Sequence, residues 1–167
     1  MATTKPAVEH KPPVFISRVM NPIMRRVLAS RSGRMGESLL LLHFTGRKSG
    51  RAYTVPAGYH DLDDRLVVLT NSGWRHNFRS GRPGEVTLRG RRRRARFVLV
   101  DDPDRVAEAY RRLIERYGTA RARRRLGIRF DPSRVPTLGE LREAVVASGL
   151  SVIEVRLEGG TPTWPDV

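Results

Sequence analysis

The stretch SLLLLHFT-GRKSG-RA-YTVPAGYH, residues 38–60, decides the fold class, because the hydrophobic period changes here from helical to alternating. Residues 38–45 and 53–60 each have the composition of a strand, and the basic turn 46–50 lies between them. This arrangement predicts a hairpin-like unit with a cationic tip. Before it, apolar residues recur at helical spacing over residues 14–30, where Asn21-Pro22 divides the segment into two short helices.

The rest of the chain continues the pattern of strands, with helices added late. Alternation predicts strands at 65–70, 85–89, 91–100 and 150–157, and one helical turn at 74–79. A helix is expected over 104–117, and a second runs from an N-cap at Thr137 through Ala147, with Glu140 completing a capping box. Residues 119–135 are rich in arginine and poorly periodic. Many strands with few helices favour a mainly β (α+β) fold, a small antiparallel barrel with peripheral helices.

The domain organisation follows from this reading. We expect residues 1–13 to be a disordered lead and residues 159–167 a C-terminal tail. Residues 14–158 are expected to form a single domain, because 167 residues suit one core. That domain includes the N-terminal helical segment 14–30 and a helical, arginine-rich insertion at 104–148.

Charge is the unusual property of the composition. The formal net charge is +15, and only three of the 32 basic residues are lysines. Such a field attracts anions: nucleic acid, acidic lipid headgroups or a polyanionic small molecule. The sequence has no cysteine, which excludes disulfides, cysteine-held metals and thiol nucleophiles. The longest apolar run, residues 39–42, is too short to cross a bilayer, and residues 1–13 lack an apolar signal segment, so we expect a cytoplasmic protein.

The loop TGRKSGR, residues 45–51, combines two glycines, three cations and a hydroxyl. Phosphate binding needs this mixture of backbone N–H groups, O–H donors and charge at close range. The spacing differs from that of a Walker A loop. A solvated hairpin tip is an equally good interpretation of these residues on chemistry alone.

Two other basic segments are candidates for binding a nucleic acid or a membrane surface. The run around residues 89–96 would alternate between the faces of a strand and has one aromatic neighbour, Phe97, which disfavours nucleic acid and favours a solvated strand. Segment 14–30 could lie on an anionic membrane surface or pack on the barrel. The four histidines are not paired at metal-ligand spacing and no cluster of carboxylates accompanies them, so no metal site is expected.

A second candidate site follows the strand at 65–70. Asn71-Ser72-Gly73 breaks that strand, and the pattern W-x-x-N of Trp74 and Asn77 comes next. The tryptophan could cover a flat ring while the asparagine fixes the loop; a tryptophan that caps the core is the alternative.

In this order, the helical segment with Asn-Pro, the apolar strand, TGRKSG, the strand with Pro56 and W-x-x-N resemble the deazaflavin (F420)-dependent nitroreductase family. This family belongs to the flavin/deazaflavin oxidoreductase superfamily, and its fold is a split β-barrel of the FMN-binding-like type. The resemblance covers about residues 14–115. It implies coenzyme F420, with FMN as the alternative cofactor. The cofactor-binding residues that it implies are Arg47, Lys48, Ser49, Gly50, Arg51, Pro56, Ser72, Gly73, Trp74 and Asn77.

The chemistry that the resemblance implies is hydride transfer from reduced deazaflavin to a quinone, a nitro compound or an activated alkene. Tyr59, Tyr110 and Tyr117 are candidate proton donors or pocket walls. A homodimer is expected by analogy with other split barrels. The sequence departs from the family pattern at Tyr53, where relatives carry an arginine, and at the arginine-rich segment 121–125. An FMN-binding protein, a non-catalytic F420 carrier and a basic nucleic-acid or membrane-surface module stay open as alternatives.

Overall fold

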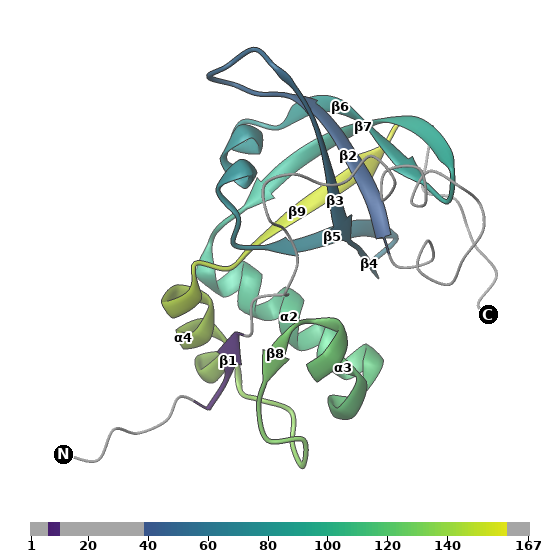
Figure 1. The fold of residues 1–167 in the computed structure, drawn as a ribbon. Helices are drawn as coiled ribbons and strands as arrows, with labels where there is room; N and C mark the ends of the chain where they lie inside the picture. Colours follow the sequence, from purple (N-terminus) through teal and green to yellow (C-terminus); the bar gives the residue numbers. More distant parts are fainter. Residues whose placement is uncertain (1–6, 11–38, 160–167) are drawn as a thin grey trace. The chain divides into compact units, whose positions relative to one another are not determined.

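The computed structural model describes residues 7–10 and 39–159, and the helices expected at 14–30 lie outside these residues (Figure 1). By its contacts, the described part divides into two compact units. One unit comprises residues 7–10, 69–71 and 100–152; the other comprises 39–68, 72–99 and 153–159.

The second unit is built on a seven-stranded sheet with the order β3-β2-β6-β7-β9-β5-β4 (Figure 1). The bounds of these strands are β2 Leu39–Thr45, β3 Ala52–Gly58, β4 His60–Leu62, β5 Arg65–Thr70, β6 Arg82–Leu88, β7 Arg91–Val100 and β9 Ser151–Leu157. The 3₁₀-helix η2, Gly73–Phe78, follows β5. This mainly β architecture, with a curled sheet and a few helices, confirms the predicted fold class.

β2 is paired on both of its sides, whereas β3 stands at an edge of the sheet. β2 pairs antiparallel with β3 on one side and with β6 on the other. Among the described strands, β3 pairs with β2 alone and forms an edge of the sheet. This position explains how Pro56 can stand in a strand, since proline has no N–H to donate to a second neighbouring strand. The predicted strand 53–60 is divided between β3 and β4. These two strands stand at opposite ends of the strand order, so the chain crosses from one edge of the sheet to the other at Tyr59.

Two tight turns hold the hairpins in register. Asp63 and Asp64 connect β4 to β5, and both have positive φ, at 51° and 56°. Arg89 and Gly90 connect β6 to β7 in the same way, at 48° and 74°. Positive φ at both central residues suits the right-handed twist of the flanking strands.

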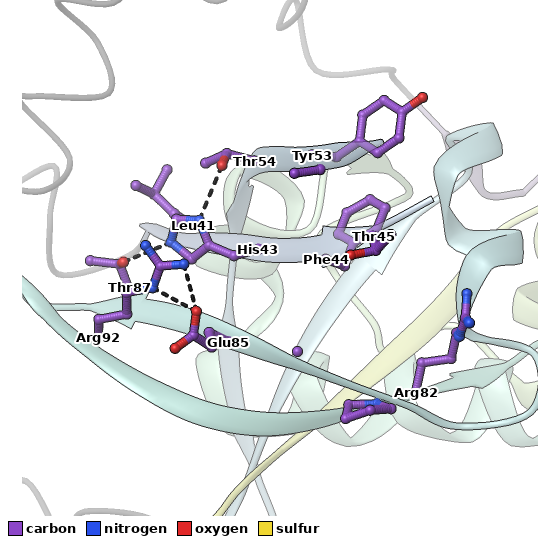
Figure 2. A pocket seen from close by; sticks show the side chains of 13 residues that line it. Leu41, His43, Phe44, Thr45, Tyr53, Thr54, Arg82, Glu85, Thr87 and Arg92 are labelled. Atoms are coloured by element: carbon purple, nitrogen blue, oxygen red, sulfur yellow. Dashed lines mark hydrogen bonds and ion pairs between the residues drawn. The ribbon is translucent and has the colours of Figure 1, made fainter. Parts of the chain in front are cut away.

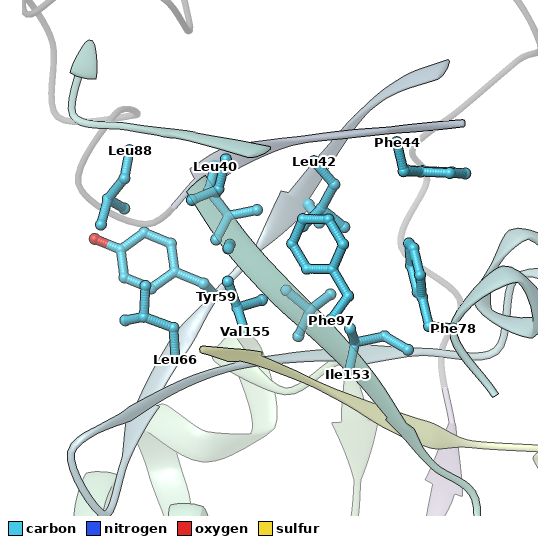
Figure 3. Close-up of a cluster of buried hydrophobic side chains, with 14 of the residues drawn as sticks. Leu40, Leu42, Phe44, Tyr59, Leu66, Phe78, Leu88, Phe97, Ile153 and Val155 are labelled. Carbon is cyan, nitrogen blue, oxygen red and sulfur yellow. The ribbon is translucent and has the colours of Figure 1, made fainter. Parts of the chain in front are cut away.

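The core of this unit lies against one face of the sheet (Figure 3). β2 contributes Leu40, Leu42 and Phe44 to it at alternate positions, as the period of two requires. Phe78 and Phe97 are fully buried, with ring centroids 5.0 Å apart. The other members include Leu66, Val68, Val86, Leu88, Ile153 and Val155.

The first unit is helical: α2, Pro103–Tyr117, packs against α3, Thr119–Arg125, and α4, Leu138–Ser148. Asp102 caps α2, since its carboxylate accepts from the Arg105 N–H at 2.9 Å. The helix α3 falls in the segment that showed little periodicity, because only Ala122 of its residues is buried. Glu9–His10, expected within a disordered lead, form β1, which pairs with β8, Ile128–Arg129.

Gly84 lies where the sheet leaves no room for a side chain. A Cβ there would stand 2.5 Å from Phe97 Cε2 and 2.6 Å from the His43 carbonyl oxygen. We therefore expect Gly84→Ala to lower the free energy of unfolding by about 1–3 kcal/mol, measured by denaturant titration. Gly139→Ala in α4 is the control, because its nearest atom would be 3.9 Å away, and it should raise stability by up to about 1 kcal/mol. Equal effects of the two substitutions would contradict this assignment.

The predicted capping box of α4 is present and is reinforced by an ion pair. Glu140 Oε2 accepts from the Thr137 N–H at 2.8 Å, and the Glu140 N–H donates to Thr137 Oγ1 at 3.3 Å. The Arg134 guanidinium donates to the same carboxylate at 2.7 Å. The ion pair and the hydrogen bonds lower the pKa of Glu140 from 4.5 to about 2.

This pKa predicts how stability depends on pH. The folded state favours the ionised carboxylate, so its stabilisation is present above pH 4.5 and is lost as the pH falls toward 2. We expect Glu140→Gln to lower the melting temperature at pH 7, with the difference from wild type shrinking between pH 4.5 and 2. Glu143→Gln on the same helix is the matched control, and a pH-independent difference for Glu140→Gln would refute the ion-pair explanation.

Candidate functional site

The loop between β2 and β3 is closed by its own backbone. The Gly46 N–H donates to the Arg51 carbonyl at 2.8 Å, and the Gly50 N–H donates to the Gly46 carbonyl at 2.9 Å. Gly50 has a φ of +65°, a conformation that glycine adopts without strain. The loop therefore presents Arg47, Lys48 and Ser49 at its exposed tip in a defined turn.

Asn77 joins this loop to η2. Its Oδ1 accepts from the Arg47 N–H at 2.8 Å, and its Nδ2 donates to the Trp74 carbonyl at 2.8 Å. One amide side chain thus holds the cationic loop and the tryptophan in fixed relation. The sequence suggested that Asn77 fixes the loop beside Trp74; in the structure its Oδ1 holds the loop between β2 and β3 instead.

Aromatic rings connect the site to the core. Phe44 is buried. Its ring centroid lies 5.6 Å from that of Tyr53, and the two rings are stacked with an interplanar angle of 21°. The centroids of Phe44 and Trp74 are 6.4 Å apart. Phe78 packs edge-on against both Phe44 and Trp74, with ring centroids 4.9 Å and 6.0 Å apart. Because Phe78 also packs on Phe97, the aromatic surface of the site rests on the fully buried part of the core.

Tyr53 packs closely over Gly46. A Cβ at Gly46 would stand 2.6 Å from both Tyr53 Cε2 and Ser49 Oγ, so only glycine allows this approach. Tyr53 Oη is hydrogen-bonded to Ser49 Oγ at 3.1 Å, and Ser49 Oγ also accepts from the Arg51 N–H at 3.3 Å. Tyr53 is 43% exposed, so its ring offers a flat apolar surface beside the cationic loop.

These elements surround a cavity of ≈ 590 Å³, which we call the loop cavity. Its wall is made of Phe44, Gly46, Arg47, Lys48, Ser49, Tyr53, Gly73, Trp74, His76, Asn77 and Arg79. A Cβ at Gly73 would meet nothing within 4 Å, so the floor of the cavity is open at this point. The donor set suits an anionic group, and the aromatic rings suit a flat apolar ring beside it.

Six of the ten cofactor-binding residues implied by the sequence line this cavity: Arg47, Lys48, Ser49, Gly73, Trp74 and Asn77. The other four, Gly50, Arg51, Pro56 and Ser72, do not line it. Sequence reasoning missed Phe44, Gly46, His76 and Arg79 and treated Tyr53 only as a departure from the family pattern. Alternation along β2 could have identified Phe44, whereas its stacking on Tyr53 depends on the register of two strands.

The three tyrosines considered as proton donors or pocket walls lie outside the wall of the loop cavity. Tyr59 is 5% exposed in the core of the sheet unit, and Tyr110 is 2% exposed in the core of the helical unit. Burial raises the pKa of Tyr110 well above its usual value. Tyr117 lies under the Arg125 guanidinium, 4.6 Å from the ring centroid. None of the three lines the loop cavity.

A second cavity, of ≈ 800 Å³, lies on the opposite face of the sheet (Figure 2). Its centre is His43, whose Nδ1 is 3.1 Å from Thr54 Oγ1 and whose Nε2 is 2.8 Å from Thr87 Oγ1. Phe44 and Tyr53 belong to the walls of both cavities.

Within residues 7–10 and 39–159, no group of three or more His, Asp or Glu side chains could hold a metal ion. Nor does any helix there combine the length and apolar character needed to cross a membrane.

A sheet protein with a cavity that combines stacked aromatic rings and a cationic glycine loop belongs to the class that binds a flat, anionic cofactor. The family model of the F420H(2)-dependent quinone reductases matches residues 16–128, about two thirds of the chain. The chain belongs to this family and is an F420-dependent oxidoreductase.

Solved structures give more distant likenesses. The FAD and heme binding protein from Mycobacterium smegmatis is 18% identical, with 85% of this chain and 75% of that chain covered and a TM-score of 0.42. A FAD-binding protein from Mesorhizobium loti is 12% identical, with 83% and 91% covered and a TM-score of 0.35. No curated protein matches the chain.

The link between Asn77 and the loop can be tested directly. We expect Asn77→Ala to expose the Arg47 N–H and to accelerate its hydrogen exchange at least about tenfold, because its only described acceptor is removed. Amide exchange of the loop, followed by mass spectrometry or NMR, measures this. Asn71→Ala is the control, since its Nδ2 bonds the Ser148 carbonyl in the helical unit. Unchanged exchange at Arg47 would show that Asn77 does not hold the loop.

Proposed function

We propose that the loop cavity binds coenzyme F420 and that the protein passes a hydride from the reduced cofactor to a quinone. The observation that carries this proposal is the meeting of Arg47 and Lys48 with Tyr53 and Trp74 in one cavity. F420 has matching parts, an anionic phosphodiester and a flat deazaflavin ring. The family supplies the quinone as acceptor class.

The residues of the loop would hold the anionic part of the cofactor. Arg47 and Lys48 supply charge, and Ser49 supplies a hydroxyl whose orientation is held by Tyr53 and by the Arg51 N–H. Arg79 and His76 stand on the η2 side of the same cavity, with Arg79 donating to His76 Nδ1 at 3.3 Å. Charge-assisted hydrogen bonds of this kind are about twice as strong as neutral ones.

The aromatic side chains would position the ring. Trp74 and Tyr53 both flank Phe44, so the cavity has an apolar wall that excludes water from one side of a bound ring. When bound, reduced F420 supplies the hydride, and this chain supplies orientation and a shaped acceptor space. Among the described residues, the wall carries the cations Arg47, Lys48 and Arg79, which favour a neutral or anionic acceptor such as a quinone over a cation.

The decisive experiment is a titration of the purified full chain into oxidised F420, following deazaflavin fluorescence, with FMN measured in parallel. We expect micromolar or tighter binding of F420 and weaker binding of FMN. Turnover is then measured as loss of reduced F420 with a quinone, a nitroaromatic compound and an enone, and the quinone should give the highest kcat/KM. Tighter binding of FMN would overturn the choice of cofactor, and binding without turnover would favour a carrier.

Lys48 and Arg51 provide a matched pair on one loop. Both are exposed cations, but Lys48 lines the loop cavity and Arg51 does not. We expect Lys48→Ala to weaken F420 binding about tenfold or more, since a hydrogen bond to a charged group is worth about 1.5–3 kcal/mol. Arg51→Ala should weaken it by about twofold or less, through the general field alone. An equal loss of F420 affinity in both variants would show that lining the cavity does not matter for binding.

A further inference from the structure

The helical unit separates its charges along the chain. Between Glu115 and Asp131 there are six arginines and neither aspartate nor glutamate. In α2 and α4, by contrast, arginines pair with acidic side chains: Arg111 Nε lies 3.0 Å from Glu115 Oε1, and Arg142 Nε lies 2.9 Å from Asp104 Oδ1. The segment 116–130, which contains α3 and β8, therefore concentrates positive charge that no acidic residue of the same segment offsets.

Two arginines of α3 face away from the interior of the unit. Ala122 is the buried residue of this helix and marks its inner side. At about 3.6 residues per turn, Arg124 lies nearly opposite Ala122, and Arg121 lies about one turn before Arg124. Both arginines are exposed, and neither forms an ion pair with another described residue. Arg125, by contrast, covers the Tyr117 ring.

The loop between β8 and α4 passes beside α3 and carries two exposed apolar side chains (Figure 1). Thr119 Oγ1, at the start of α3, donates to the Pro132 carbonyl in this loop at 2.7 Å. Val135 stands three residues after Pro132, within about 10 Å of extended chain. Leu138 begins α4, and Val135 and Leu138 are 37% and 40% exposed.

Two cations and two aliphatic side chains thus belong to one end of the helical unit. We call this set the mixed surface: Arg121, Arg124, Val135 and Leu138.

The composition of the mixed surface distinguishes between anionic partners. Single-stranded nucleic acid is bound by stacking of bases on exposed aromatic rings. Among residues 116–130, however, the Tyr117 ring lies under Arg125 and Phe130 is buried. The phosphates of a duplex would use the arginines but would leave Val135 and Leu138 without a role. Aliphatic side chains beside guanidinium groups suit the boundary of a bilayer, where anionic headgroups meet acyl chains.

We infer that the mixed surface binds a membrane surface that carries anionic lipid headgroups. Arg121 and Arg124 donate to the headgroup phosphates, and Val135 and Leu138 enter the apolar boundary beneath them. So few groups give a reversible attachment that salt weakens. The inference goes beyond the proposed function and does not depend on it, because no residue of the mixed surface lines the loop cavity or the second cavity.

The test is co-sedimentation of the purified full chain with lipid vesicles. One set of vesicles is phosphatidylcholine alone, and the other contains about 30% phosphatidylglycerol, which supplies the anionic headgroups. We expect binding to the anionic vesicles only, with a sharp decrease at about 0.5 M salt. The double variant Arg121→Gln/Arg124→Gln should bind them at least about tenfold more weakly, because each arginine near an anionic surface adds severalfold to the affinity.

A second double variant controls for net charge. Arg91→Gln/Arg94→Gln also removes two exposed arginines, but from β7 of the sheet unit. We expect it to weaken vesicle binding by about twofold or less, through the general field alone. An equal loss in the two double variants would overturn the inference, because it would show only the effect of net charge.

The apolar part of the mixed surface has its own control. Leu138→Ser should weaken binding to the anionic vesicles about threefold or more, since a leucine side chain gains from leaving water. Val146→Ser on the same helix should leave the binding unchanged, because Val146 is 59% exposed but stands about 12 Å further along α4. Equal losses in these two variants would refute a role for Leu138.

The remaining outcomes separate this inference from the proposed function. Turnover of reduced F420 with a water-soluble quinone should be the same in Arg121→Gln/Arg124→Gln and wild type, so loss of vesicle binding alone identifies a docking surface. Equal binding of wild type to both kinds of vesicle, or to neither, would overturn the inference. Binding of a DNA duplex that Arg121→Gln/Arg124→Gln loses, without vesicle binding by wild type, would make this a nucleic-acid surface instead.

Discussion

The structure of the sheet unit depends on the two faces of β2. This strand is paired on both sides, so its register fixes β3 and β6 at once. Its alternate residues divide strictly between the core and the outer face, because successive side chains of a strand point in opposite directions. A shift of one residue would exchange Phe44 for His43 in the core, so the packing of the core and the position of both cavities are fixed by the same constraint.

The aromatic wall of the loop cavity is continuous with the core, whereas its cations stand on an exposed loop. Phe44 and Phe78 belong to the core, and Trp74 packs against it, so the aromatic wall inherits the order of the closely packed interior. The cations stand on an exposed loop that is held by backbone bonds and by Asn77. Such a loop needs no residues of its own in the core, which explains why five consecutive polar or glycine residues are compatible with a stable fold.

The fold places the basic side chains behind the net charge of +15 in several different environments. The cations of the loop face a cavity with aromatic walls, whereas those of β7 are separated by parity between two faces. Other arginines serve local structure: Arg134 completes the cap of α4, and Arg125 covers Tyr117. The charge alone therefore predicts an affinity for anions, and only the positions of the side chains distinguish one anion from another.

The sequence by itself determined most of the elements and the cationic loop. The change of hydrophobic period at residues 38–45 and the capping box at Thr137 are local signals, and the strand and the helix that they predicted are present. Local signals failed at α3 and β1, where long-range packing and pairing supply the stabilisation. The resemblance suggested Tyr59 and Tyr110 as proton donors or pocket walls, and the structure places both among buried residues. Only the tertiary structure brought Tyr53 onto Phe44 and Asn77 to the Arg47 N–H, because strand register and the fold of η2 join residues that are distant in the chain.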